Sequence, residues 1–212
     1  MTTALLILTA VVAVGDWVAV SRDQHRVELA LKPLTLILLI AAAASADLGD
    51  AKPWVIAALV LGLIGDIALM FSAQDTADAA FVGGLSAFLL GHIAYAIAFL
   101  RHGVQGLQFA GGVLIVSGVA ALLLPKLIPG VRAAGGSQLL GPVLGYVGAL
   151  GLMTALAVGT GSALTAVGGV LFLASDGTLA WQRFVKVLPH GPVTVIMTYH
   201  LAQILIVIGL MQ

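Results

Sequence analysis

Long apolar segments, separated by short polar stretches, follow one another along the whole chain. Eight can be drawn, and each is close to the ~20 residues that a helix needs to cross a hydrocarbon core about 30 Å thick. They cover residues 3–20, 29–46, 54–71, 79–100, 107–124, 140–158, 163–181 and 193–211. Only residues 159–162 separate the sixth segment from the seventh, so a count of seven stays open. The pattern predicts an all-α fold, a polytopic transmembrane helical bundle of about eight spanning helices.

Prolines stand near the starts of several of these spans. Pro33, Pro53, Pro142 and Pro192 each fall close to a predicted start. The missing N–H of proline does little harm in the first turn of a helix, where that donor has no partner within the helix. We therefore expect Lys32-Pro33 to open the second span and the other three prolines to open later ones.

The composition narrows the class of protein. Of the 212 residues, 61% are hydrophobic and 8% are charged, and the mean hydropathy is +1.15. Soluble domains carry about 25% charged residues. All connections are short, so residues 1–212 are expected to form a single integral membrane domain. Basic and acidic residues both number 9, which gives no indication of nucleic acid as a partner. The absence of cysteine excludes disulfides, a thiol nucleophile and thiolate metal ligands.

The basic residues are distributed unequally between the two ends of the spans. Seven of the nine lie in the connections after the first, third, fifth and seventh spans: Arg22, Arg26, Lys32, Lys126, Arg132, Arg183 and Lys186. The positive-inside rule places these connections in the cytoplasm and both termini outside. No Lys or Arg precedes Arg22, so the first span lacks the charged start of a signal peptide and is expected to be retained. We expect an integral multi-pass protein of a bacterial cell (inner) membrane.

Three of the nine acidic residues fall inside predicted spans. Six others are expected in solvated connections: Asp23, Glu28, Asp47, Asp50, Asp75 and Asp78. Asp16, Asp66 and Asp176 each follow a small residue and lie four to six residues before their spans end. That places them about 6–9 Å from the same membrane face. Asp176 could also be structural, capping or bonding a neighbouring helix. An ionised carboxylate in hydrocarbon costs at least ~2.5 kcal/mol, and three acids at one depth indicate a functional site.

The even-numbered spans supply uncharged polar partners for these acids. His92 and Tyr95 are three residues apart, so they share one face of the fourth span. Tyr199 and Gln203 are four apart on the last span, with His200 beside them. His92 and Gln203 could instead only satisfy hydrogen bonds between helices. These groups are expected to line a site together with the acids.

Other roles are possible for Lys32, Ser175 and the histidines. Lys32 stands at the membrane boundary, where a snorkelling side chain is the simpler explanation and a substrate contact the alternative. Ser175 would need a base in reach to act as a nucleophile, and its neighbour Asp176 points about 100° away on a helix. His92 and His200, the histidines well inside predicted spans, have no second histidine or acidic residue three or four positions away, so no metal is expected.

Five segments carry a family resemblance. They are LKPLT (31–35), GDIALMF (65–71), FVGGLSAFLLGHIAYAIAF (81–99), GGVLFLASDGTLA (168–180) and YHLAQILI (199–206). In this order and with this number of spans, the chain resembles the lysoplasmalogenase (YhhN-like) family of multi-pass membrane proteins. The fifth and sixth spans carry no recognisable motif. The resemblance implies hydrolysis of the vinyl ether bond of lysoplasmalogens to a fatty aldehyde and a glycerophospho-ethanolamine or -choline. It also implies that Asp66 and Asp176 are the functional acids.

Two carboxyl groups suit this chemistry. Vinyl ether hydrolysis begins with proton transfer to carbon, so one carboxyl would act as acid while the other stabilises the cation and activates water, as in a glycosidase. Asp66 and Asp176 would be catalytic, and Lys32, His92, Tyr95, Tyr199 and Gln203 would contact the substrate. Asp16, Ser175 and His200 would be supporting residues. The expected partners are a lysophospholipid entering from the bilayer and water, with no cofactor.

Two other classes of function stay open. Intramembrane acids also serve proton relays, so the chain could be a proton-coupled transporter of a small molecule or lipid. A transporter is expected to have broken helices near the midplane and access from both sides. A lipid-binding or structural membrane protein would leave the layer of three acids without a function. The grouping of the acids toward one face favours the enzyme.

Overall fold

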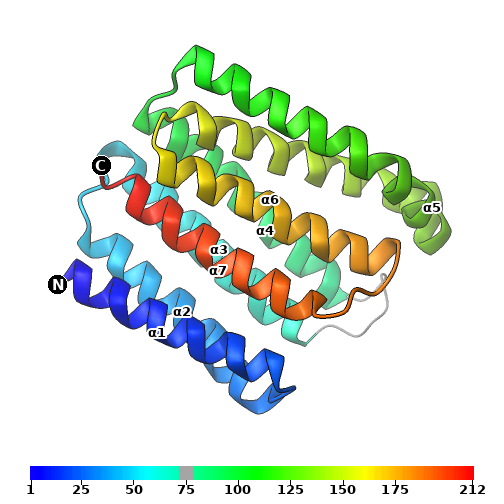
Figure 1. Cartoon of the computed structure of the whole chain (residues 1–212), viewed down its shortest axis with the longest axis horizontal. Coiled ribbons are helices and arrows are strands. Elements are labelled where there is room, and N and C mark those ends of the chain that lie inside the picture. Colours follow the sequence, from blue (N-terminus) through cyan, green and yellow to red (C-terminus); the bar gives the residue numbers. More distant parts are fainter. Residues whose placement is uncertain (72–78) are drawn as a thin grey trace.

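The computed structural model describes residues 1–71 and 79–212, and every secondary-structure element in these residues is a helix. In order these are α1 (Thr2–Ser21), α2 (His25–Ser45), the 3₁₀ helix η1 (Gly49–Ala51), α3 (Lys52–Met70), α4 (Ala79–His102), α5 (Gly106–Gly159), α6 (Ala163–Phe184) and α7 (Gly191–Gly209). The seven α-helices in the described residues are each long and apolar enough to cross a membrane, and they run side by side (Figure 1). The predicted all-α transmembrane bundle is confirmed. Asp75 and Asp78 lie outside the described residues.

Helix α5 is two spans joined by a reversal. At 1.5 Å per residue its 54 residues would be about 80 Å long if straight, more than twice the hydrocarbon thickness. The backbone leaves helical geometry at Gly135 and Gly136, where Gly136 has φ 63° and ψ −159°, a conformation essentially restricted to glycine. The two arms lie alongside each other (Figure 1). They approach so closely that a Cβ on Gly112 would lie 2.7 Å from the Ala155 carbonyl oxygen. With the two arms of α5 counted separately, the described residues form eight long apolar helical segments, the number that the apolar pattern predicts.

Two of the four prolines open helices as expected, and two do not. Pro53 and Pro192 stand in the first two positions of α3 and α7. Pro33 lies inside α2, eight residues after the helix begins at His25, and Pro142 lies inside α5. The prediction for Pro33 was wrong because the apolar pattern marks the membrane boundary, whereas the helix continues into the polar surface layer. Glu28, predicted in a connection, is consequently in the first turn of α2.

Close contacts between helices use small residues. Helix α6 packs against both α5 and α7, α3 packs against α4, and α7 also reaches α1. A Cβ at Gly168 of α6 would lie 2.9 Å from the Ala202 carbonyl oxygen of α7, and one at Gly169 would lie 2.6 Å from the Ala157 Cβ of α5. In lipid, where apolar surface gains nothing by leaving water, such close backbone approach is a main source of helix association.

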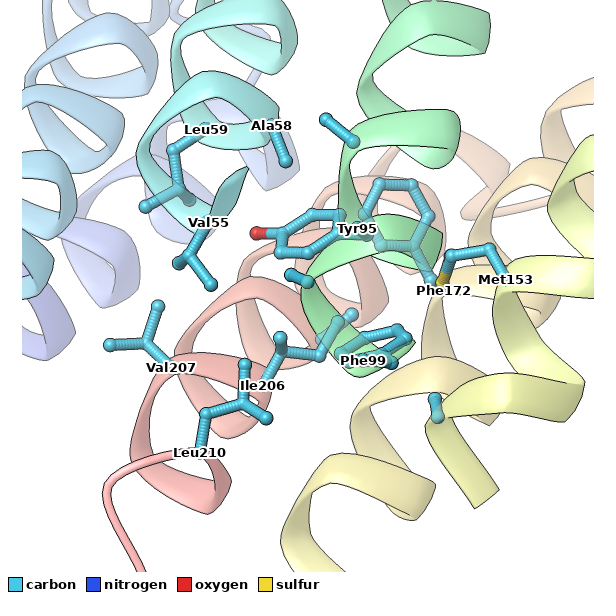
Figure 2. Close-up of a cluster of buried hydrophobic side chains, with 14 of the residues drawn as sticks. Val55, Ala58, Leu59, Tyr95, Phe99, Met153, Phe172, Ile206, Val207 and Leu210 are labelled. Atoms are coloured by element: carbon cyan, nitrogen blue, oxygen red, sulfur yellow. The ribbon is translucent and has the colours of Figure 1, made fainter. Parts of the chain in front are cut away.

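A dense apolar core fills one half of the bundle. Figure 2 shows Val55, Ala58 and Leu59 of α3 facing Tyr95 and Phe99 of α4, with side chains of α5, α6 and α7 completing the cluster. These residues come from the beginning of α3 and the end of α4, which is the end of the molecule where both chain termini lie (Figure 1). The opposite half, where α1, α3 and α6 end, is less filled and contains the site described next.

Candidate active site

A cavity of about 440 Å³ lies in the half of the bundle away from the termini. Its walls come from α2 to α7 and are mainly apolar, including Leu85, Phe88 and Leu150. The polar and charged residues on its wall are His25, Glu28, Lys32, Asp66, Tyr146, Ser175, Asp176, Arg183 and Tyr199. Asp66 and Asp176 thus line one cavity, as the shared depth of the acids predicts.

The first of these carboxyls is paired with a cation. Lys32 Nζ lies 3.2 Å from Asp66 Oδ1, with side chains 15% and 3% exposed. The snorkelling interpretation of Lys32 was wrong, because α2 begins a turn earlier than expected and carries Lys32 into the bundle. A buried ion pair is tolerated in a membrane where a lone charge would not be. Gly65, beside Asp66, lets the Phe88 ring lie against α3, where a Cβ would approach that ring to 2.7 Å.

The second carboxyl has a phenol and an imidazole as partners. Tyr146 donates its hydroxyl proton to Asp176 Oδ2 at 2.5 Å, and His92 Nε2 lies 3.2 Å from the same oxygen. The imidazole also lies 3.0 Å from the Tyr146 hydroxyl and packs edge-on against the Phe172 ring, with centroids 4.9 Å apart. His92 is buried and is not among the described residues that line the cavity. His92 therefore contacts Asp176 on the side away from the cavity and does not form part of the cavity wall.

Asp176 is deeper than its predicted span suggests. Helix α6 continues to Phe184, so Asp176 lies eight residues before its end, compared with five for Asp16 and four for Asp66. The shared depth is therefore approximate, because the polar residues after Leu179 do not end the helix. The extra turn brings Arg183 onto the same helix face as Asp176.

Tyr199 belongs to the cavity, but Tyr95 and Gln203 do not line it. Tyr95 donates its hydroxyl proton to Gln203 Oε1, and both side chains are fully buried between helices α4 and α7. Their expected contact with substrate is thus corrected to a contact with each other. Tyr199 packs edge-on against Phe88 and Phe172, with ring centroids 5.9 Å and 5.4 Å away.

The three supporting residues lie around the cavity in different ways. Ser175 lines it, but its hydroxyl donates to the Val195 carbonyl oxygen at 3.0 Å. His200 is buried and accepts a hydrogen bond from Trp17 Nε1 through Nδ1 at 3.2 Å. Asp16 is fully buried in α1, outside the cavity lining of the described residues, and neither of its carboxyl oxygens has a hydrogen-bond partner among those residues. The catalytic and binding roles of all these residues stay predictions.

Two residues of the site were missed in the sequence. Tyr146 lies in the second arm of α5, which carries no recognisable motif. Its signal was available, since the chain has only three tyrosines and all of them fall in predicted spans. Arg183 was counted only as a basic residue of a connection, although it follows Asp176 by seven residues, or two helical turns.

Comparison with known proteins assigns the family. The family model described as the YhhN family matches residues 27–210. A lysoplasmalogenase of Mycobacterium bovis is 34% identical over 182 residues, which cover 85% of this chain and 69% of that protein. Human lysoplasmalogenase TMEM86B is 34% identical, covering 73% of this chain and 62% of its own length. Bovine lysoplasmalogenase TMEM86A is 32% identical, covering 73% and 63%. No solved structure matches this chain. The chain belongs to the YhhN family.

Proposed function

We propose that this protein hydrolyses the vinyl ether bond of lysoplasmalogens, releasing a fatty aldehyde and glycerophospho-ethanolamine or glycerophospho-choline. The names of its relatives support the reaction. The observation that carries the proposal is the pair of buried carboxyls, Asp66 and Asp176, on the wall of one largely apolar cavity. The volume is within the ~300–1,000 Å³ of ligand sites, and apolar walls suit an alkyl chain.

The different partners of the two carboxyls suggest different roles. The Lys32 ammonium pairs with an ionised Asp66, which suits Asp66 to stabilise a cation and take up a proton from water. Asp176 has a phenol and an imidazole as partners, and within the described part of the chain no lysine or arginine forms a salt bridge with it. In the proposal Asp176 is the proton donor, and His92 and Tyr146 hold its carboxyl in position.

The reaction follows from these roles. Asp176 gives its proton to the alkene carbon one bond beyond the ether-bearing carbon, and the ether oxygen shares the resulting positive charge as an oxocarbenium ion. The Asp66 carboxylate stabilises this ion and takes a proton from the water that attacks it, which yields a hemiacetal. Cleavage of the hemiacetal carbon–oxygen bond then leaves the aldehyde: Asp66 gives its proton to the departing glycerol oxygen and Asp176 takes the proton of the hemiacetal hydroxyl, so both carboxyls return to their starting states. The steps consume one water molecule and no oxidant or reductant.

Polar atoms beside Asp66 are suited to hold the attacking water. Asp66 Oδ2, the Tyr199 hydroxyl and Gln203 Nε2 are buried and have no hydrogen-bond partner among the described residues. The Tyr199 hydroxyl lies near both the Asp66 carboxyl and the Gln203 amide without a well-aligned hydrogen bond to either. A Cβ on Gly62, one turn before Asp66, would lie 3.0 Å from the Tyr199 hydroxyl and 3.2 Å from Gln203 Nε2. Buried polar groups that face one another without pairing directly are commonly bridged by water.

A test with three lipids examines the reaction itself. Purified protein in detergent or nanodiscs is given lysoplasmalogen, its saturated 1-O-alkyl analogue and a 1-acyl lysophospholipid of equal chain length. Aldehyde and glycerophospho-alcohol should appear from the vinyl ether lipid alone, because only its double bond can accept a proton on carbon. Release of free fatty acid from the acyl lipid, with no aldehyde from lysoplasmalogen, would replace the proposal with an esterase.

A further inference from the structure

We propose that Arg183 forms a subsite for the phosphate group of the lipid; this rests on the proposed function and defines how its site selects a phospholipid. Arg183 lies in the last turn of α6 and lines the same cavity as the two carboxyls. Its guanidinium Nε and Nη2 atoms are buried and have no hydrogen-bond partner among the described residues. The Arg183 Cζ atom lies over the Phe81 ring, 4.5 Å from its centroid, a cation–π contact.

The two atoms without partners form one edge of the guanidinium. Their N–H bonds run parallel, which is the geometry that takes two oxygens of one phosphate. A buried cationic donor left without a partner costs free energy, and an anion that binds there removes that cost. Of the other basic residues on the described cavity wall, Lys32 is paired with Asp66, and His25 lies 3.5 Å from Glu28. Arg183 therefore has the donors available for an anionic ligand.

The spacing along α6 fits a lysophospholipid. Asp176 and Arg183 are seven residues apart, so they share one helix face and are separated by about 10 Å along its axis. Side chains on a helix point back toward its N-terminus, which brings the guanidinium closer to Asp176 than its Cα. Six bonds connect the ether-bearing alkene carbon to phosphorus, or about 7 Å when extended, since three backbone bonds span about 3.5 Å. Leu179 and Ala180 line the cavity between the two positions.

The test measures binding and does not need catalysis. Radiolabelled 1-O-alkyl lysophosphatidylethanolamine, which has no vinyl group, and 1-O-alkylglycerol, which has no phosphate, are bound to the protein in nanodiscs. The wild type should prefer the phospholipid by about 10- to 100-fold, the effect of a bidentate hydrogen bond between charged groups. Arg183→Gln should lose this preference while binding alkylglycerol as before, which also shows that it folds. Inorganic phosphate should compete only weakly, because it lacks the chain.

Two further variants complete the test. Arg183→Lys keeps the charge and the stem but loses the parallel N–H edge, so an intermediate preference is expected even if the Gln variant does not fold. Arg132→Gln removes an exposed arginine outside the cavity lining and should bind both lipids as the wild type does. Equal preference in the wild type, Arg183→Lys and Arg183→Gln would overturn the subsite, as would strong binding of inorganic phosphate with no phospholipid preference. If the preference depends on Arg183 but no aldehyde forms from lysoplasmalogen, the proposed reaction fails and the phosphate subsite stands.

Discussion

At the scale of single residues, the partners of the two carboxyls distinguish them. Asp66 has an ammonium at 3.2 Å, whereas Asp176 has a phenol at 2.5 Å and an imidazole at 3.2 Å. The ammonium beside Asp66 favours an ionised carboxylate there. The phenol and imidazole beside Asp176 can hold its carboxyl in place without a fixed counter-charge. Acid and base chemistry within one site depends on such unequal surroundings.

Lys32→Gln tests the ion pair. Removing the ammonium leaves the buried Asp66 without its counter-ion, and breaking a buried pair typically costs about 3–5 kcal/mol. We expect a clear loss of thermal stability in detergent and at least about a 100-fold loss of turnover. The double variant Lys32→Gln/Asp66→Asn should recover much of the stability but none of the activity, because its buried pair is neutral. Unchanged stability and turnover in the single variant would return Lys32 to the role of a snorkelling side chain.

Tyr146→Phe tests the support of Asp176. The change removes the hydroxyl that donates to Oδ2 but keeps the ring, so turnover should fall by about 10- to 100-fold while lipid binding is retained. Thr154→Val is the control. It removes a buried hydroxyl that donates to the Gly169 carbonyl oxygen between α5 and α6, outside the cavity lining of the described residues, so it should lower stability by about 1 kcal/mol with a smaller effect on turnover. Equal turnover losses in the two variants would mean that the Tyr146 hydroxyl has no specific role.

The residue types of the site were largely visible in the sequence, but their contacts were not. Hydrocarbon penalises charge so strongly that the positions of Asp16, Asp66 and Asp176 indicated a site, and the family resemblance selected Asp66 and Asp176 among them. The separation of Tyr95 from the cavity could not be predicted. Helical spacing shows that His92 and Tyr95 share one face of a helix, but it does not show which neighbouring helix packs against that face. Tyr146 and Arg183 were missed because side chains from other spans decide what a lone tyrosine or arginine touches.

At the scale of elements, glycines decide where helices approach and where space remains. Gly62 of α3 leaves room beside the Tyr199 hydroxyl and Gln203 Nε2, whereas Gly83 of α4 has no atom within 4 Å of a built Cβ. Both are helical, so alanine at either position gains about 1 kcal/mol of helix propensity. The two glycines therefore separate an effect on the site from an effect on the helix.

Gly62→Ala should reduce turnover while Gly83→Ala should not. The added methyl group at position 62 would take the space between polar groups that we assign to the attacking water, and we expect a loss of about 10-fold or more with lipid binding preserved. The comparison uses steady-state aldehyde release together with binding of the saturated analogue. Wild-type turnover in Gly62→Ala would remove the proposed position of the water.

Apolar periodicity predicted the spans better than the helix ends. The predicted all-α bundle is confirmed in the described residues, and the fifth and sixth predicted spans correspond to the two arms of α5. Pro33 was misplaced relative to the start of α2, and the span predicted to end at residue 181 continues to Phe184, because hydrogen bonding continues where hydropathy falls. In α6 this extra turn carries Arg183 to the cavity.

At the scale of the whole molecule, the two halves of the bundle differ. The half near the termini is closed by the core of Figure 2, and the other half contains the cavity. Access from one half suits an enzyme whose substrate and products stay on one side, whereas alternating access would need the core to open. The assignment of the cavity to the cytoplasmic side, with both termini outside, stays a prediction from the distribution of basic residues.

The central claim is that Asp66 and Asp176 act together in one hydrolytic site, and the turnover of single and double Asn variants tests it most directly. General acid–base catalysis contributes about 10²–10⁴-fold, so Asp66→Asn and Asp176→Asn should each lose at least about 100-fold while still binding the saturated lipid. The double variant should lose little more than the worse single one. Asp16→Asn, which alters a buried carboxyl outside the cavity lining of the described residues, should lose much less. Near-normal aldehyde release from either single variant at Asp66 or Asp176, or losses that multiply in the double variant, would contradict the account.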